Sequence, residues 1–246
     1  MTSSSAEALV ASRLTTVRER LVSACDRAER SPASVRIIGV TKTHPPALCR
    51  AAVANGLIDL AENRVQELTA KQPLVPGARW HLVGHLQRNK VTSVVGKQVL
   101  VHSLDRRRLA DALSRRAEQL GAVQRLLVQV NVADDPAKGG CHVDEVLDLI
   151  AYARELPHLA VEGLMTIPPL PGDDEDPGDT AREHFARLRE LRDRARARFP
   201  EVVHLSMGMS ADLEAAVAEG ATMIRIGTAL FGPRADAPWR GQEAVQ

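Results

Sequence analysis

The sequence is poor in aromatic residues and has no excess of charge of either sign. Phe, Trp and Tyr together make up 2% of the 246 residues, so few side chains could stack on the bases of a single-stranded nucleic acid. The 32 basic and 31 acidic residues are interspersed and leave a net charge of +1, so no broad basic surface is expected. The composition therefore predicts neither a nucleic acid nor an anionic membrane as a partner.

Long apolar runs and paired cysteines are also missing. No segment approaches the ~20 apolar residues of a membrane-spanning helix, and the amino terminus lacks the apolar core of a signal peptide. The cysteines, Cys25, Cys49 and Cys141, are odd in number and far apart, without the spacing of metal ligands. We therefore expect a cytoplasmic protein with buried or half-buried thiols, no disulfide framework and no metal site.

What the sequence does contain is a regular alternation of apolar runs and helical patterns. Strands are expected near 36–42, 57–60, 80–83, 99–102, 126–130, 161–165, 202–205 and 223–226. Helical spacing is clearest at 47–54, 105–120, 143–156, 181–199 and 211–219, and weakest at 87–95. Eight buried strands in a chain close to the ~250 residues of a typical barrel predict a (β/α)8 TIM barrel, with a doubly wound open sheet as the alternative.

The rest of the chain fits a single domain over residues 1–246. A capping box in Ser4–Glu7 and the apolar spacing after it predict an extra helix at about 5–30. The barrel is expected at about 35–234, with a short tail after it. The segment Pro168–Thr180, rich in proline, glycine and acidic residues, predicts a mobile surface loop after the sixth strand.

The first strand leads into a lysine, in the stretch RIIGVTKTHPP. Since side chains alternate along a strand, Lys42 is expected on the same inward face as Ile38 and Val40, at the mouth of the barrel. Lysines at strand ends also commonly extend into water, so this position alone does not identify a reactive amine.

Glycine and hydroxyl residues follow the seventh and eighth strands. Gly208 lies between Ser206 and Ser210 ahead of a helix, and Gly227 with Thr228 ends the eighth strand. Each pattern is common at an ordinary helix start. The loops after strands seven and eight of a TIM barrel frequently form one phosphate site, so the two together predict an anion-binding cradle beside Lys42.

Arg225 interrupts the apolar eighth strand, on the same face as Met223 and Gly227. A permanently charged group at such a position needs a partner. Two partners remain open: a carboxylate across the barrel, or a ligand that presents an anion or a ring nitrogen.

Between about Val35 and Arg234 the chain resembles the pyridoxal phosphate homeostasis proteins, whose barrel is similar to the amino-terminal domain of alanine racemase. The matching segments are GVTKTHP, AENRVQE, WHLVGHLQRNK, VHSLD, VNVADDPAKGGC, VEGLMTIP and LSMGMSADLEAAVAEGATMIRIGTALFG. The resemblance implies a protein that holds pyridoxal 5′-phosphate (PLP) covalently on Lys42 as a Schiff base and supplies it to apo-enzymes. It implies a PLP carrier and not an enzyme, and we expect a monomer.

The resemblance also implies roles for single residues. The phosphate would be surrounded by Ser206, Gly208, Ser210, Gly227 and Thr228. Arg225 would face the pyridine nitrogen, and Asn63 would line the ring. Ala61 and Arg64 depart from the family pattern, which commonly has glycine and tyrosine there, so further contacts from that turn are left unassigned.

Four other residues near the expected mouth receive weaker assignments. His81, Gly84 and Met165 are given a packing role. Lys138 is a candidate relay amine, because transfer of an aldehyde between lysines needs a second amine, although a solvated loop lysine is an equally good interpretation.

Two enzymatic alternatives would use the same lysine and cradle. One is a PLP-dependent amino-acid racemase without its second domain, and the other is a Schiff-base aldolase acting on a phosphorylated sugar. Neither has an evident second acid or base, since the only tyrosine, Tyr152, is expected inside a helix. Arg225 beside the ring nitrogen would also discourage its protonation and weaken PLP as an electron sink. The residues therefore favour carriage over catalysis.

Overall fold

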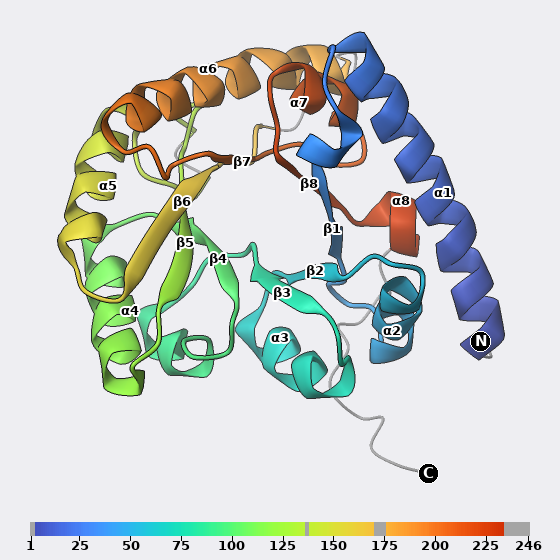
Figure 1. Ribbon diagram of the computed structural model, residues 1–246, viewed down its shortest axis with the longest axis horizontal. Helices are drawn as coiled ribbons and strands as arrows, with labels where there is room; N and C mark the ends of the chain where they lie inside the picture. The colour runs from blue at the N-terminus through green and yellow to red at the C-terminus, as the bar shows by residue number, and fades with distance from the viewer. Residues whose placement is uncertain (1–2, 136–137, 170–175, 234–246) are drawn as a thin grey trace.

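Eight parallel strands close into a barrel in the computed structural model, which describes residues 3–135, 138–169 and 176–233 (Figure 1). The strands pair in chain order, and the last closes on the first. They are β1 (Arg36–Val40), β2 (Asp59–Glu62), β3 (Arg79–Leu82), β4 (Leu100–Leu104), β5 (Gln124–Gln129), β6 (Leu159–Met165), β7 (His204–Ser206) and β8 (Met223–Ile226). This order confirms the predicted TIM barrel and excludes the open sheet.

Helices surround the barrel (Figure 1). The α-helices are α1 (Ser3–Arg27), α2 (Pro46–Ala54), α3 (Val65–Lys71), α4 (Arg107–Leu120), α5 (Val146–Glu155), α6 (Pro177–Arg198), α7 (Leu213–Ala218) and α8 (Thr228–Phe231). Short 3-10 turns lie at Pro32–Ser34, Gln72–Leu74, Arg88–Ser93 and Val143–Glu145. The extra helix α1 packs against α2, α7 and α8. Among the described helices, none is long and apolar enough to cross a membrane.

The apolar residues form two cores, as alternation along the strands requires. The larger core lies between the strands and the helices, and α1 contributes Val10, Leu14, Val17 and Leu21 to it. The smaller one fills the barrel interior with Ile38, Val40, Ala61, Val83, Leu100, Leu127, Met165 and Met223. Cys25, Cys49 and Cys141 are buried free thiols, as expected. Burial raises the pKa of Cys49 to about 11 and that of Cys141 to about 12.

Several element boundaries differ from those expected. Strand β2 begins at Asp59, two residues later than predicted, because its pairing with β3 starts at Asp59 and Arg79. The helices α3 and α8 were not anticipated, since each is shorter than the window of about 11 residues in which helical spacing is recognised. The segment 87–95, the weakest helical pattern, is a 3-10 turn at Arg88–Ser93.

Helix α6 begins inside the segment expected to be a mobile loop. The side chain of Asp176 accepts hydrogen bonds from the N–H groups of Gly178 and Asp179, and Pro177 occupies the first turn. Asp176 and Pro177 therefore form a helix start instead of a continued loop. Of the predicted loop Pro168–Thr180, residues 170–175 lie outside the described residues.

Candidate functional site

Lys42 lies at the carboxyl end of β1, in a tight turn. The N–H of His44 donates to the carbonyl of Thr41 over 3.0 Å, which closes a four-residue turn with Lys42 in its second position. Ile38 and Val40 face the barrel interior, as expected. The strand ends at Val40, however, so the alternation that was to direct Lys42 inward stops two residues before it. Its position follows from the turn, where it is partly buried.

The turn has a strained backbone. Thr43 has a φ of 69°, a left-handed conformation that a β-branched residue rarely adopts. Its N–H donates to Glu67 Oε2 over 2.8 Å, and its hydroxyl is buried without a hydrogen-bond partner. Such strain persists only where the surroundings enforce it, and it gathers at functional sites. The strained residue here directly follows Lys42.

A buried cluster of two carboxylates and one lysine holds this turn. The ammonium of Lys71 donates to Thr41 O at 2.8 Å, Glu62 Oε1 at 2.7 Å and Glu67 Oε2 at 3.0 Å. The hydroxyl of Thr41 donates to Glu62 Oε1 over 2.6 Å. We call Glu62, Glu67 and Lys71 the buried triad. The sequence pattern did not predict this triad, and its only sign there is the i, i+4 spacing of Glu67 and Lys71.

Burial shifts the pKa of one member of the triad, Glu62. Glu62 and Lys71 are both 0% exposed. Burial raises the pKa of Glu62 to about 7, and the charge of Lys71 opposes this shift. The carboxyl group of Glu62, which contacts Thr41 in the Lys42 turn, therefore has a pKa close to neutral pH.

The loops after β7 and β8 lie beside this turn, because β8 pairs with both β1 and β7. Gly208 has a φ of 91°, and a Cβ there would lie 2.4 Å from that of Ala216, so only glycine fits. The carbonyl of Ser210 accepts from Arg20 Nη1 at 3.0 Å, which ties this loop to α1. Helix α8 begins at Thr228, directly after Gly227.

Arg225 is buried on β8, between the strands that carry the Lys42 turn and the loop after β7. Its side chain donates to Ser206 Oγ at 2.9 Å and to the carbonyl of Thr166 at 2.8 Å. Burial lowers its pKa to about 10, which leaves it charged at neutral pH. Of the two partners left open, a carboxylate is not found within ion-pair distance in the described parts of the chain. Three of its five N–H groups remain for a ligand.

Ser206 faces the barrel interior. Its side chain is 0% exposed and contacts both Arg225 and His102 Nδ1, the latter at 2.9 Å. Since Arg225 donates to this hydroxyl, Ser206 has a single proton to offer, and His102 accepts it whenever its Nδ1 is unprotonated. Of the other residues expected in the cradle, Gly208 is buried, Ser210 and Gly227 are partly buried, and Thr228 is exposed.

The other residues considered lie on or directly after the strands β2, β3 and β6. Asn63 is exposed after β2, and a Cβ on Gly84 would lie 2.0 Å from its carbonyl, so these two loops meet closely. Met165 belongs to the interior apolar cluster. Arg64 is exposed. His81 does more than pack, since it contacts Asp59 and His102.

Lys138 and Tyr152 lie in different surroundings. Lys138 is partly buried, and its N–H donates to the carbonyl of Asp135. Its relay role stays a prediction. Tyr152 lies on α5, as expected, and its hydroxyl donates to Asp111 of α4 at 2.5 Å. The tyrosine is therefore held between two outer helices.

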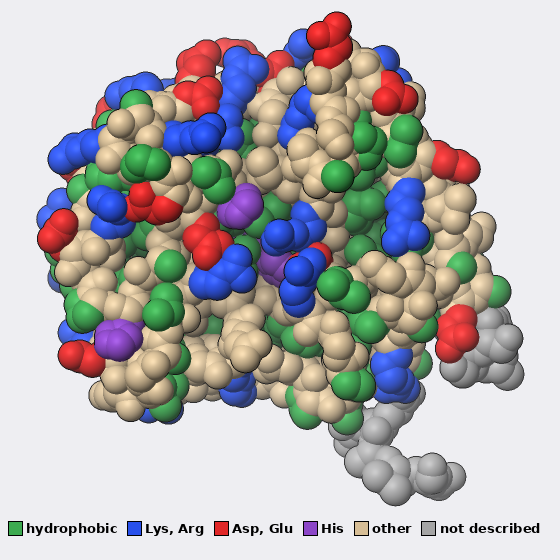
Figure 2. Space-filling view, viewed as in Figure 1, with side chains coloured by type: hydrophobic (Ala, Val, Ile, Leu, Met, Phe, Trp, Pro, Cys, Tyr) green, Lys and Arg blue, Asp and Glu red, His purple; other side chains and the backbone are tan. Residues whose placement is uncertain are grey.

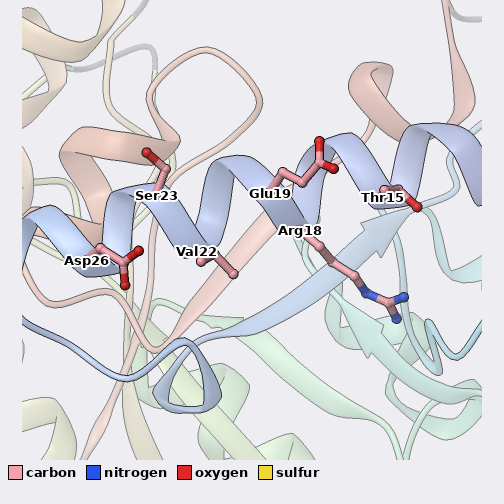
Figure 3. Close-up of a pocket in the computed structure, with 6 residues that line it drawn as sticks. All are labelled: Thr15, Arg18, Glu19, Val22, Ser23 and Asp26. Carbon is pink, nitrogen blue, oxygen red and sulfur yellow. The ribbon is translucent and has the colours of Figure 1, made fainter.

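Two surface hollows lie away from the Lys42 turn and the loops after β7 and β8. One, of about 410 Å³, runs along α1 and is lined by Thr15, Arg18, Glu19, Val22, Ser23 and Asp26 (Figure 3). All six residues are exposed and come from a single helix, so the hollow encloses no ligand. The other, of about 440 Å³, includes Arg36, Asp59 and Arg79 at the amino ends of their strands.

On the face shown in Figure 2, basic side chains gather over the barrel centre, with acidic and histidine side chains between them.

Comparison with known proteins gives a consistent result. The family model for the amino-terminal domain of alanine racemase matches residues 14–235. The pyridoxal phosphate homeostasis protein of Aquifex aeolicus is 45% identical over 90% of this chain and 97% of its own. That of Pseudomonas aeruginosa is 39% identical over 92% and 96%.

Solved structures agree with the sequence matches. PipY of Synechococcus elongatus, in a structure with PLP bound, is 36% identical with a TM-score of 0.77, over 91% of this chain and all of that one. An alanine racemase of Clostridium difficile shares the fold, with a TM-score of 0.69 at 14% identity over 87% and 58% of the two chains. The chain thus belongs to the pyridoxal phosphate homeostasis protein family.

Proposed function

We propose that this protein binds PLP as a Schiff base on Lys42 and supplies it to apo-enzymes. The observation that carries the proposal is the adjacency of three chain segments. The turn that holds Lys42, the glycine and hydroxyl loops, and the buried cation Arg225 all follow or lie on β1, β7 and β8, which are neighbours in the barrel. Each of the three suits a different group of PLP: the aldehyde, the phosphate and the ring nitrogen.

The donor set fits PLP group by group. A primary amine, Lys42, suits the aldehyde. Backbone N–H groups and hydroxyls at Ser210, Gly227 and Thr228 suit a phosphate. Arg225, which can only donate hydrogen bonds, suits a ring nitrogen without a proton. Asn63, at the top of β2, is assigned to the edge of the ring.

The same donor set favours carriage over turnover. Bound PLP stabilises a substrate carbanion best when its ring nitrogen is protonated. The positive charge of Arg225 disfavours that proton. Tyr152, the only tyrosine, is bonded to Asp111 between outer helices and is not available as a second acid or base. We propose a non-enzymatic role in the cytoplasm, and a monomeric state that light scattering would test.

The attachment is tested on purified protein loaded with PLP. We expect a visible absorption band that borohydride bleaches, with the reduced adduct on the peptide that contains Lys42. Lys42→Ala is expected to lose the band and keep the fold, since a partly buried side chain is removed from a turn. Lys97→Ala, at an exposed lysine, is the control and should keep the band. A borohydride-stable adduct on Lys42→Ala would refute the assignment.

Supply to apo-enzymes needs a separate experiment. Loaded protein is mixed with an apo PLP enzyme in the presence of a phosphatase that destroys free PLP. Direct transfer predicts recovery of enzyme activity under these conditions. Equal protection of activity by loaded protein and by free PLP would show that the protein only releases PLP into solution.

A further inference from the structure

A continuous line of hydrogen bonds crosses the barrel interior from Asp59 on β2 to Arg225 on β8. Asp59 Oδ1 lies 3.1 Å from His81 Nε2, and His81 Nδ1 lies 2.9 Å from His102 Nε2. His102 Nδ1 lies 2.9 Å from Ser206 Oγ, which accepts from Arg225 Nη1 at 2.9 Å. We call these five side chains the interior chain. None is more than 5% exposed.

Strand alternation places this polar line inside the barrel. The apolar interior cluster includes Ala61, Val83, Leu100 and Met223. Each lies two positions from a member of the interior chain on the same strand or at its end, and residues two apart share a face. The barrel is therefore filled partly by a polar line in place of apolar side chains.

The ends of the interior chain restrict where its protons lie. The guanidinium of Arg225 can only donate, and the ionised carboxylate of Asp59 can only accept. Ser206 accepts from Arg225, so its own O–H can donate to His102 Nδ1. His102 then donates from Nε2 to His81 Nδ1, and His81 donates from Nε2 to Asp59. Both rings are neutral in this arrangement, and both carry their proton on Nε2.

One other arrangement fits the same distances. A charged His81 would donate to both Asp59 and His102, and His102 would donate from Nδ1 to Ser206. Burial opposes this arrangement, because it lowers the pKa of His81 despite the hydrogen bond to Asp59. Burial also lowers the pKa of His102 well below its usual value, and positive neighbours add to the effect. Two neutral rings are the favoured state.

The interior chain connects Arg225 to an anion at the opposite end of the barrel. Asp59 pairs with Arg79 at 2.6 Å and lies against the hollow at the amino ends of the strands. Burial by itself would raise the pKa of Asp59, but hydrogen bonds from His81 and Arg79 outweigh it, and the net shift is downward. Asp59 also lies 3.8 Å from Arg36, so its charge is shared with two arginines. Hydrogen bonds in a buried line polarise one another, so the interior chain couples Asp59 to the cation at the other end.

We infer that Asp59, His81, His102 and Ser206 are positioning residues for Arg225. They anchor one side of its guanidinium through the hydroxyl of Ser206, at the end of a line that begins at the carboxylate of Asp59, and its other N–H donors remain for a ligand. This inference rests on the proposed function only for the identity of that ligand, PLP with an unprotonated ring nitrogen. It assigns to Ser206 a role toward Arg225 and not toward the phosphate.

The proton arrangement is tested on the apo protein, without PLP. Nitrogen NMR of uniformly labelled protein reports which ring nitrogen of each histidine carries a proton. We expect His81 and His102 to be neutral at neutral pH, with the proton on Nε2 in both. A charged His81, or a proton on Nδ1 of either ring, would overturn the inference. This measurement needs no variant beyond single substitutions for assignment.

A matched pair of serine substitutions tests the coupling along the interior chain. Ser206→Ala removes the donor to His102 Nδ1, and we expect the signals of both His102 and His81 to shift. Ser103 is 0% exposed on the same strand as His102, but its hydroxyl has no hydrogen-bond partner. Ser103→Ala should leave both rings unchanged. An unshifted His81 in Ser206→Ala would mean that the contacts are independent.

Ligand affinity tests the positioning itself. Ser206→Ala is expected to weaken PLP binding by roughly tenfold, as for loss of a hydrogen bond to a charged group, while Ser103→Ala binds like the wild type. Equal affinity of Ser206→Ala and wild type would refute the positioning role. Absence of PLP binding by the wild type would instead refute the proposed function, and the histidine protonation states of the apo protein would still decide the arrangement of the interior chain.

Discussion

Replacing Lys71 by methionine tests the buried triad that holds the Lys42 turn. Lys71 uses all three ammonium protons, at 2.7 to 3.0 Å, on Thr41, Glu62 and Glu67. Lys71→Met keeps most of the side-chain volume but leaves two buried carboxylates without a cation. Removal of one partner from a buried ion pair costs about 3–5 kcal/mol of unfolding free energy. In a chain of this length that corresponds to a fall in Tm of roughly 6–20 °C.

The pH dependence gives the sharper readout. Burial already raises the pKa of Glu62 from 4.5 to about 7, so the folded state binds more protons than the unfolded state between these values. Stability therefore falls as the pH rises through that window. The positive charge of Lys71 lowers the pKa of Glu62, so removing that charge raises this pKa further and extends the pH window upward. We thus expect the stability difference between wild type and Lys71→Met to be larger at about pH 8 than at about pH 5.5.

Denaturant unfolding at the two pH values measures this difference. Lys97→Met, at an exposed lysine, is the control and should change stability by less than about 0.5 kcal/mol at either pH. Adding Glu62→Gln to Lys71→Met removes one of the unpaired charges and should restore part of the loss. The reasoning would be refuted if Lys71→Met cost no more than the control, or if its cost grew as the pH fell.

Two further predictions concern the ligand. Ser210→Ala and Thr228→Val are each expected to weaken PLP affinity by roughly 1–3 kcal/mol, nearly additively, and wild-type affinity of both in a titration would place the phosphate elsewhere. The protein is expected to show no appreciable racemisation of alanine, and sustained conversion of L- to D-alanine that depends on Lys42 would favour the enzymatic alternative.

The fold was predictable because its signal repeats along the chain. Each apolar run of about four residues marks a strand buried on both faces, and eight such runs separated by helical spacing leave few topologies. Short elements carried no such signal. Helix α8 spans only Thr228–Phe231, and the start of α6 depends on Asp176 and Pro177 in a segment whose composition indicates a loop.

The places of the proposed site residues in the barrel were predictable, but their contacts were not. The order of elements placed Lys42 and the two loops at the carboxyl ends of β1, β7 and β8, and the barrel makes these strands neighbours. The sequence could not reveal that Lys42 lies in a turn closed by His44 and Thr41, because strand alternation predicts a direction only while the strand continues. It also could not pair Asp59 with His81, since that contact depends on register between strands.

The energetically unfavourable features of this structure, a strained backbone and buried charged groups, lie around the proposed site. Thr43 adopts a left-handed φ, Lys71 and Glu62 are fully buried, and Arg225 is a buried cation that forms no ion pair within 4.0 Å among the described residues. None of these features stabilises a barrel better than apolar side chains would. They share one consequence, a fixed amine-bearing turn beside a fixed donor-only cation. Such an arrangement supports tight holding of a ligand at two ends, and the only tyrosine of the sequence, Tyr152, is bonded to Asp111 between two outer helices.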